Sequence, residues 1–151
     1  MTAYSAVGKM HEMRDSDSCD LRQEVREAVS RALVQEFGRA DTLRMLVLFG
    51  SRARGRQRAS SDVDLAVAMD APLQGQEQQH LQASISAALR TDTDLVDLLS
   101  APSHLVSQIL RHGEILVGAR SPALGSIIAK MVSEREDIAP YQRRILEERV
   151  R

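Results

Sequence analysis

The sequence predicts a single α/β or α+β domain in which helices flank a small mixed β-sheet. Short apolar segments at 43–49, 63–69 and 93–99 have the length of strands, and they alternate with longer segments of helical periodicity. The chain has 151 residues, of which 43% are hydrophobic and 27% charged. This size and composition suit one soluble domain with a core of its own.

The N-terminal part predicts an extension followed by a helix. Residues 1–18 are polar and mixed, and we expect them to form a flexible N-terminal extension. A helix should begin at Asp20, which can act as its N-cap with Gln23 placed as in a capping box, and end at Gly38. The folded domain is therefore predicted to span residues 19–151.

Two predicted strands follow, at 43–49 and 63–69. Residues 45–49 of the first strand are apolar without alternation, so we expect both faces of the strand to be buried and the strand to be central in the sheet. The connection between the strands is too short for a crossover helix, so they should be antiparallel neighbours.

The remainder of the chain predicts alternating helices and strands. The expected elements are a helix at 76–90 with a solvated glutamine-rich start, a strand at 93–99, a helix capped by Ser100 or Ser103 and ending at Gly113, an extended segment at 114–117, and a helix from Pro122. Pro140 should break this last helix near Ala139. The charged C-terminal helix beyond it is either a solvated surface or a partner-docking surface.

Composition argues against several classes of function. The net charge is −1, and the aromatic residues are two Phe, two Tyr and no Trp, so we expect no direct contact with nucleic acid. The single cysteine, Cys19, excludes an intrachain disulfide and is read as an incidental thiol. No apolar segment has the length of a membrane span or of a secretion signal, which predicts a cytoplasmic protein.

Two carboxylates lie in the stretch that follows the first strand. Gly50-Ser51 ends that strand, a basic loop follows, and Asp62 and Asp64 open the next strand. Side chains alternate along a strand, so these two carboxylates should point to the same side. Carboxylate oxygens are ligands for Mg²⁺, and a site of this kind can hold a metal-bound triphosphate.

The neighbouring turn offers groups for the phosphates. Gly50 permits close approach to the backbone, and the Ser51 hydroxyl can donate a hydrogen bond. If residues 51–54 begin a helical turn, its N–H groups point towards an anion. The guanidinium groups of Arg52 and Arg54 suit phosphate oxygens. Each feature alone is common, but their order along the chain is specific.

This order resembles the nucleotidyltransferase superfamily that includes DNA polymerase β, whose signature is Gly-Ser, a loop, and then Asp-x-Asp. Here Gly50-Ser51 is followed by residues 52–61 and then by Asp62-Val63-Asp64. The chain is especially similar to the minimal nucleotidyltransferases, the MNT or MntA-like proteins that are paired with HEPN toxins in prokaryotic toxin–antitoxin modules. The resemblance extends over about residues 22–150, because the strand at 93–98 and the segment at 109–117 also look family-like.

The resemblance implies a polymerase β-like fold and an antitoxin enzyme. Such an enzyme uses Mg²⁺ and transfers AMP from ATP to a tyrosine hydroxyl of its HEPN RNase toxin, which neutralises the toxin. Asp62, Asp64 and one carboxylate of the third strand would be the catalytic metal ligands. The phosphate contacts would fall on four residues of the turn, Gly50, Ser51, Arg52 and Arg54.

The third carboxylate has two candidates, Asp94 and Asp97. They are three positions apart, so on a regular strand they face opposite sides. In the family, the carboxylate directly before the Leu-Val-Asp-Leu run takes this role. The resemblance therefore selects Asp94 as metal ligand and as general base for the acceptor hydroxyl. Asp97 and Asp92 are expected at the surface or paired with an arginine.

Three other functions compete with the antitoxin enzyme. A small-molecule nucleotidyltransferase of the aminoglycoside-modifying type shares this core, but it normally adds further helices for its acceptor. An antitoxin that acts by binding alone would not need the carboxylates. A polymerase or tRNA-modifying enzyme needs a nucleic-acid surface, which the composition does not supply.

Overall fold

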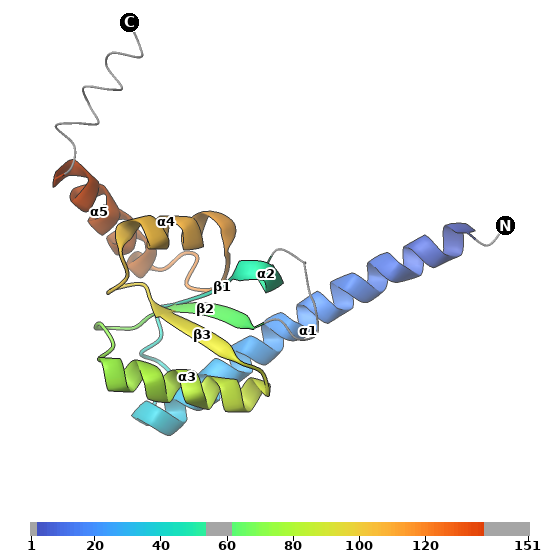
Figure 1. Ribbon diagram of the computed structural model, residues 1–151, viewed down its shortest axis with the longest axis horizontal. Coiled ribbons are helices and arrows are strands. Elements are labelled where there is room, and N and C mark those ends of the chain that lie inside the picture. Colours follow the sequence, from blue (N-terminus) through green and yellow to red (C-terminus); the bar gives the residue numbers. More distant parts are fainter. Residues whose placement is uncertain (1–2, 54–61, 138–151) are drawn as a thin grey trace, which may run out of the picture.

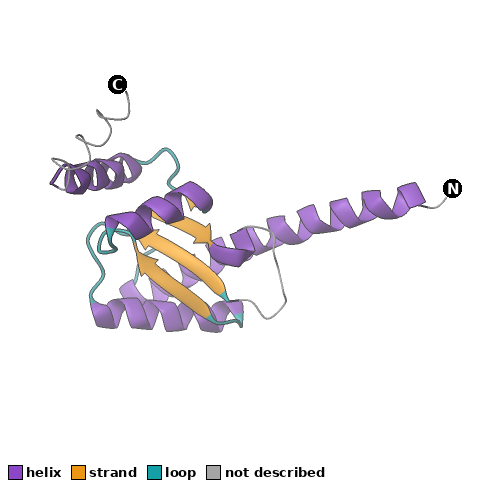
Figure 2. Cartoon of the chain, turned by 45° about the horizontal axis from the view of Figure 1, so that its top comes forward, coloured by secondary structure: helices purple, strands orange, loops and turns teal. Residues whose placement is uncertain are grey.

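A four-stranded sheet lies between two layers of helices (Figures 1 and 2). The computed structural model describes residues 3–53 and 62–137, and side-chain surroundings for residues 20–53 and 62–134. The strands are β1 (Met45–Phe49), β2 (Val63–Ala68), β3 (Thr93–Asp97) and β4 (Glu114–Val117), and their order across the sheet is β3-β2-β1-β4. β1 is antiparallel to β2 and β4, whereas β2 and β3 are parallel. The predicted mixed sheet and the antiparallel first pair are therefore confirmed.

The helices cover both faces of this sheet. They are α1 (Ala3–Phe37), α2 (Gly50–Ala53), α3 (Gly75–Leu89), α4 (Ser103–His112) and α5 (Pro122–Asp137). Figure 1 shows α4 and α5 above the strands and α3 below them, while α1 passes behind the sheet and packs against α3. Alternation along β1 sends Leu46 and Leu48 into the core with α1 and α3, and Met45 and Val47 into the core with α4 and α5. β1 is thus buried on both faces, as predicted.

The first helix is longer than the sequence predicts. It begins at Ala3 instead of Asp20, so Asp20 is an interior helical residue and not the N-cap. No proline interrupts residues 3–20, and a helix that is already nucleated gains one backbone hydrogen bond for each residue added. The extra turns extend well past the sheet in Figures 1 and 2. The flexibility expected for residues 1–18 stays a prediction.

The start of α4 and the end of β3 also differ from expectation. Neither Ser100 nor Ser103 caps α4: the N-cap position is Pro102, which makes no side-chain cap. β3 ends at Asp97 instead of residue 99, because the chain turns there. Gly38 ends α1 as predicted, with a φ of +74° and a hydrogen bond from its N–H to the carbonyl of Val34.

The C-terminal predictions lie outside the described residues. This applies to the break at Pro140 and to the charged helix beyond it. Among the helices that the structure describes, none combines the length and the apolar character needed to cross a membrane.

Candidate active site

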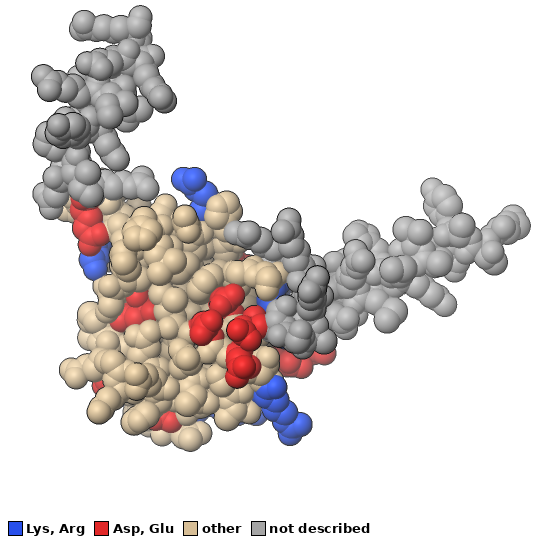
Figure 3. Space-filling view, in the orientation of Figure 1, with Lys and Arg blue, Asp and Glu red and all other residues tan. Residues whose placement is uncertain are grey.

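Three carboxylates are gathered by the pairing of β2 with β3. The parallel register places Asp64 directly beside Asp94, and Asp62 lies two residues before Asp64 at the start of β2. Alternation puts all three on the face covered by α4 and α5. Asp62 and Asp94 are exposed, and Asp64 is half-buried. Figure 3 shows acidic side chains close together in this region, beside the atoms drawn grey.

The charges of this cluster act on Asp64. Burial raises the pKa of the Asp64 carboxyl, and the neighbouring charges of Asp94 and then Asp62 raise it further. Both effects disfavour the ionised form of Asp64. A bound cation would reverse the second effect, so the electrostatics of the cluster favour cation binding.

Gly50 lets the end of β1 approach this cluster. Its φ is +75°, which L side chains rarely adopt, and a Cβ at this position would lie 2.0 Å from Oδ2 of Asp64. Phe49, the residue before it, is the β1 partner of Asp64 in the register. Glycine is therefore required for two independent reasons. The sequence predicts that a phosphate can approach the backbone of Gly50 closely. In this structure the group that lies against Gly50 is the carboxylate of Asp64.

A helical turn follows Gly50 directly. α2 spans Gly50–Ala53, so the helical turn that the sequence analysis considered for residues 51–54 is present as far as residue 53, and it carries Ser51 and Arg52 next to the cluster. Ser51 is exposed and Arg52 is half-buried. Arg54, the other predicted phosphate contact, lies outside the described residues. The turn and the carboxylates thus come from chain segments that β1 and β2 bring side by side.

Asp97 is not at the surface, so the expectation for this residue is wrong. Only 3% of its surface is exposed, and its carboxylate accepts hydrogen bonds from the N–H groups of Leu73 (2.9 Å) and Leu99 (3.0 Å) and from the hydroxyl of Ser100 (2.8 Å). The N–H of Leu73, in the turn before α3, and the N–H of Leu99, just after β3, thus each have the Asp97 carboxylate as partner. The prediction that Asp94 and Asp97 face opposite sides is confirmed.

The donor chemistry of the cluster fits a divalent cation that prefers oxygen. Among the described residues, no three acidic, histidine or cysteine side chains surround a common point as they stand. Asp62 and Asp94 are exposed and therefore have room to rotate towards Asp64. Asp92 is exposed, as expected, and lies just before the first residue of β3.

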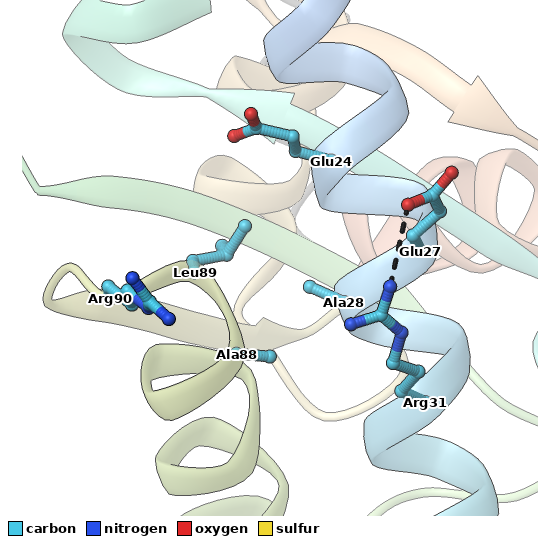
Figure 4. Close-up of a pocket in the computed structure, with 7 residues that line it drawn as sticks. All are labelled: Glu24, Glu27, Ala28, Arg31, Ala88, Leu89 and Arg90. Atoms are coloured by element: carbon cyan, nitrogen blue, oxygen red, sulfur yellow. Dashed lines mark ion pairs between the residues drawn. The ribbon is translucent and has the colours of Figure 1, made fainter.

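A cavity of about 290 Å³ lies elsewhere. Figure 4 shows it between α1 and the end of α3, on the opposite face of the sheet. Its lining includes Glu24, Glu27, Arg31 and Arg90, and an ion pair of 3.6 Å joins Glu27 to Arg31. Because the sheet separates it from the carboxylates, this cavity is not part of their site.

Two residues near the cluster were missed by the sequence analysis. Gln78 and Gln82 of α3 were expected in a solvated segment, but both are half-buried and hydrogen-bonded to the backbone of Leu95, the residue after Asp94. Their spacing of four residues places them on one side of the helix. The four-residue spacing of these two glutamines was visible in the sequence and is the pattern that could have identified them.

Comparison with known proteins identifies the family. The family described as "Polymerase beta, Nucleotidyltransferase" matches residues 32–121, which include the Gly-Ser turn and all three carboxylates. The chain belongs to this family.

Individual relatives agree with this assignment. The chain is 37% identical over 78 residues to the protein adenylyltransferase MntA of Shewanella oneidensis strain MR-1, a match that covers 52% of this chain and 56% of that protein. It thus spans about half the length of this curated relative. The resemblance to MntA-like nucleotidyltransferases is confirmed.

Solved structures share the fold. A crystal structure of a toxin–antitoxin with AMP-PNP superposes with a TM-score of 0.59 and 26% identity, covering 81% of this chain and 98% of that one. A complex of a tri-AMPylated Shewanella oneidensis HEPN toxin with its MNT antitoxin has a TM-score of 0.59 at 24% identity and covers 86% and 99%. The predicted polymerase β-like fold is therefore confirmed.

Proposed function

We propose that this nucleotidyltransferase transfers AMP from ATP to a tyrosine hydroxyl of a cognate HEPN-domain toxin and thereby neutralises it. The observation that carries the proposal is the placement of Asp64 beside Asp94, within contact of the Gly50 turn. Support comes from the curated relative named as a protein adenylyltransferase and from the toxin–antitoxin structure with AMP-PNP. Such a reaction belongs in the cytoplasm, where ATP and the toxin occur together, and needs no direct contact with nucleic acid.

Asp62, Asp64 and Asp94 would hold Mg²⁺. When bound, this ion neutralises negative charge on phosphate oxygens and fixes their position. The raised pKa of Asp64 supports the assignment, because a cluster of like charges has most to gain from a cation.

The turn after β1 would bind the triphosphate. Ser51 offers its hydroxyl, and the positive charges of Arg52 and Arg54 suit the β- and γ-phosphates. Gly50 keeps this turn against Asp64, so the phosphates and the carboxylates share one site. Positioning of this kind supplies much of the rate enhancement in phosphoryl and nucleotidyl transfer.

Asp94 would act as general base because it is exposed and can be reached by a hydroxyl of another protein. The proton of the acceptor moves to its carboxylate while the acceptor oxygen forms a bond to the α-phosphorus. The bond from that phosphorus to the oxygen shared with the β-phosphate breaks, and pyrophosphate leaves.

The test uses a HEPN protein encoded by the gene next to the one for this chain. Its intact mass is measured after incubation with this chain, ATP and Mg²⁺. We expect mass increases in whole AMP units, and none with a variant that combines Asp62→Ala and Asp64→Ala. If the variant neutralised the toxin fully without modifying it, the antitoxin would act by binding alone. Modification of an aminoglycoside by the purified chain alone, with the toxin left unmodified, would instead favour the small-molecule enzyme.

A further inference from the structure

β3, which carries Asp94, is an edge strand: among the strands that the structure describes, only β2 pairs with it. Every second residue of such a strand presents its N–H and C=O away from the sheet. At Leu95 both of these groups are bound by side chains of α3. Nε2 of Gln78 donates to the Leu95 carbonyl at 2.7 Å, and Oε1 of Gln82 accepts from the Leu95 N–H at 3.1 Å.

The same side of α3 continues this pattern. Ser86 follows Gln82 by four residues, and its hydroxyl accepts a hydrogen bond from the N–H of Thr93 at 3.2 Å. Gln78, Gln82 and Ser86 are all half-buried, whereas Gln79 is exposed. The polar side of α3 therefore occupies the place where a further strand would pair with β3.

We propose that Gln78 and Gln82 are positioning residues for the Asp94 carboxylate. They hold the backbone of the adjacent residue, Leu95, from the side of β3 that has no strand, while β2 holds the other side and carries Asp64. The inference rests on the proposed function, because Asp94 must lie opposite Asp64 for that reaction. Without these bonds, the β2 pairing alone would hold the strand that carries the general base.

The two glutamines have different chemical roles, which allows a selective test. Gln82 acts as an acceptor, and a glutamate at this position keeps an acceptor oxygen for the Leu95 N–H. Gln78 acts as a donor, and a glutamate there places a carboxylate against the Leu95 carbonyl. The same substitution should therefore be tolerated at one position and harmful at the other.

The experiment compares four variants in AMP transfer to the toxin: Gln78→Glu, Gln82→Glu, Gln82→Leu and, as matched control on the exposed side, Gln79→Glu. We expect kcat to fall about tenfold in Gln78→Glu and in Gln82→Leu, because small displacements of reacting groups have large effects. KM for ATP should stay within about twofold, since the Gly50 turn binds the nucleotide. Gln82→Glu and Gln79→Glu should keep the wild-type kcat.

Hydrogen exchange supplies a readout that does not depend on the reaction. The Leu95 amide should exchange at least about tenfold faster in Gln82→Leu than in Gln82→Glu, at equal midpoints of urea unfolding. Equal kcat in these two variants would overturn the inference even if Gln78→Glu failed to fold. A wild-type protein that left the toxin unmodified would instead overturn the proposed function, and the inference with it.

Discussion

At the scale of single residues, alternation along β3 places its two aspartates in different surroundings. Asp94 and Asp97 belong to the same short strand, yet one is exposed beside Asp64 and the other is buried in a hydrogen-bond network. The period of two was enough to predict that they face opposite sides. The partners of Asp97 were not predictable, because Leu73 comes from a distant turn whose position depends on the whole fold.

Substitution of these two aspartates should affect different properties. Asp97→Ala should lower the free energy of unfolding by about 2–3 kcal/mol, because three donors lose a buried acceptor. Asp94→Ala should change it by less than about 0.5 kcal/mol, since its side chain is exposed, and should abolish AMP transfer. Urea unfolding and the toxin mass assay measure both effects. Equal destabilisation by the two variants would contradict the assignment.

Gly50 should tolerate no side chain. We expect Gly50→Ala to lower the free energy of unfolding by about 1–3 kcal/mol, because of the positive φ and the overlap with Asp64. AMP transfer should fall at least about a hundredfold. Gly125→Ala is the matched control: it lies within α5, where a Cβ meets nothing within 4 Å, so stability should be unchanged or slightly higher.

Asp64 should make the folded protein less stable at neutral pH than at acidic pH, whereas a salt-bridged carboxylate has the opposite effect. Its pKa is raised in the folded state, so ionisation at neutral pH opposes folding, and this effect disappears as the pH falls through the folded-state pKa. Asp64→Asn should therefore be more stable than wild type at pH 7, by about 0.5 kcal/mol for two like charges on adjacent strands. The difference should vanish under acidic conditions. Urea unfolding across pH, with Asp92→Asn as the charge-matched control, checks this; an advantage that grew at low pH would refute it.

At the scale of elements, local patterns predicted what each segment is better than where it stops. The helix of residues 20–37 was correctly expected, but its start was not, because a capping signal at Asp20 does not prevent a helix from continuing through the polar residues before it. β3 stops two residues early because the chain turns after Asp97, where the N–H groups of Ser100 and Ala101 donate to the Asp97 carbonyl. The glutamine-rich start of α3 was expected to be solvated, and the bonds of Gln78 and Gln82 to Leu95 were not predictable, because the position of α3 along the edge of β3 depends on the tertiary fold.

At the scale of the whole molecule, the sheet order creates the site. Asp64 and Asp94 are neighbours only because β2 and β3 pair in parallel with the α3 crossover between them. The Gly-Ser and Asp-x-Asp motifs were visible in the sequence, and the short connection between them was sufficient to predict the antiparallel pairing of β1 with β2. The place of β4 on the far side of β1 was not predicted, since pairing between distant strands leaves no local pattern.

Nucleotide binding should stabilise the entire domain. With a non-hydrolysable ATP analogue at about a hundred times its Kd, we expect a gain of about 2.7 kcal/mol in unfolding free energy when Mg²⁺ is present. Removal of the metal with EDTA should abolish most of this gain, because the phosphates would then meet the carboxylates directly. Thermal unfolding measures the effect, and the variant with Asp62→Asn and Asp64→Asn is the control. A full gain in EDTA would argue against a metal in this site.

The two outer strands of the sheet share a property that concerns assembly. On β3, glutamine side chains bind the backbone N–H and C=O of Leu95, which point away from β2. On β4, the carbonyl of Leu116 accepts a hydrogen bond from Nε of Arg26 at 3.3 Å. A peptide that added itself as a fifth strand would first have to displace these side chains. The sheet is therefore a poor template for strand addition at these points, which protects the domain from edge-to-edge aggregation.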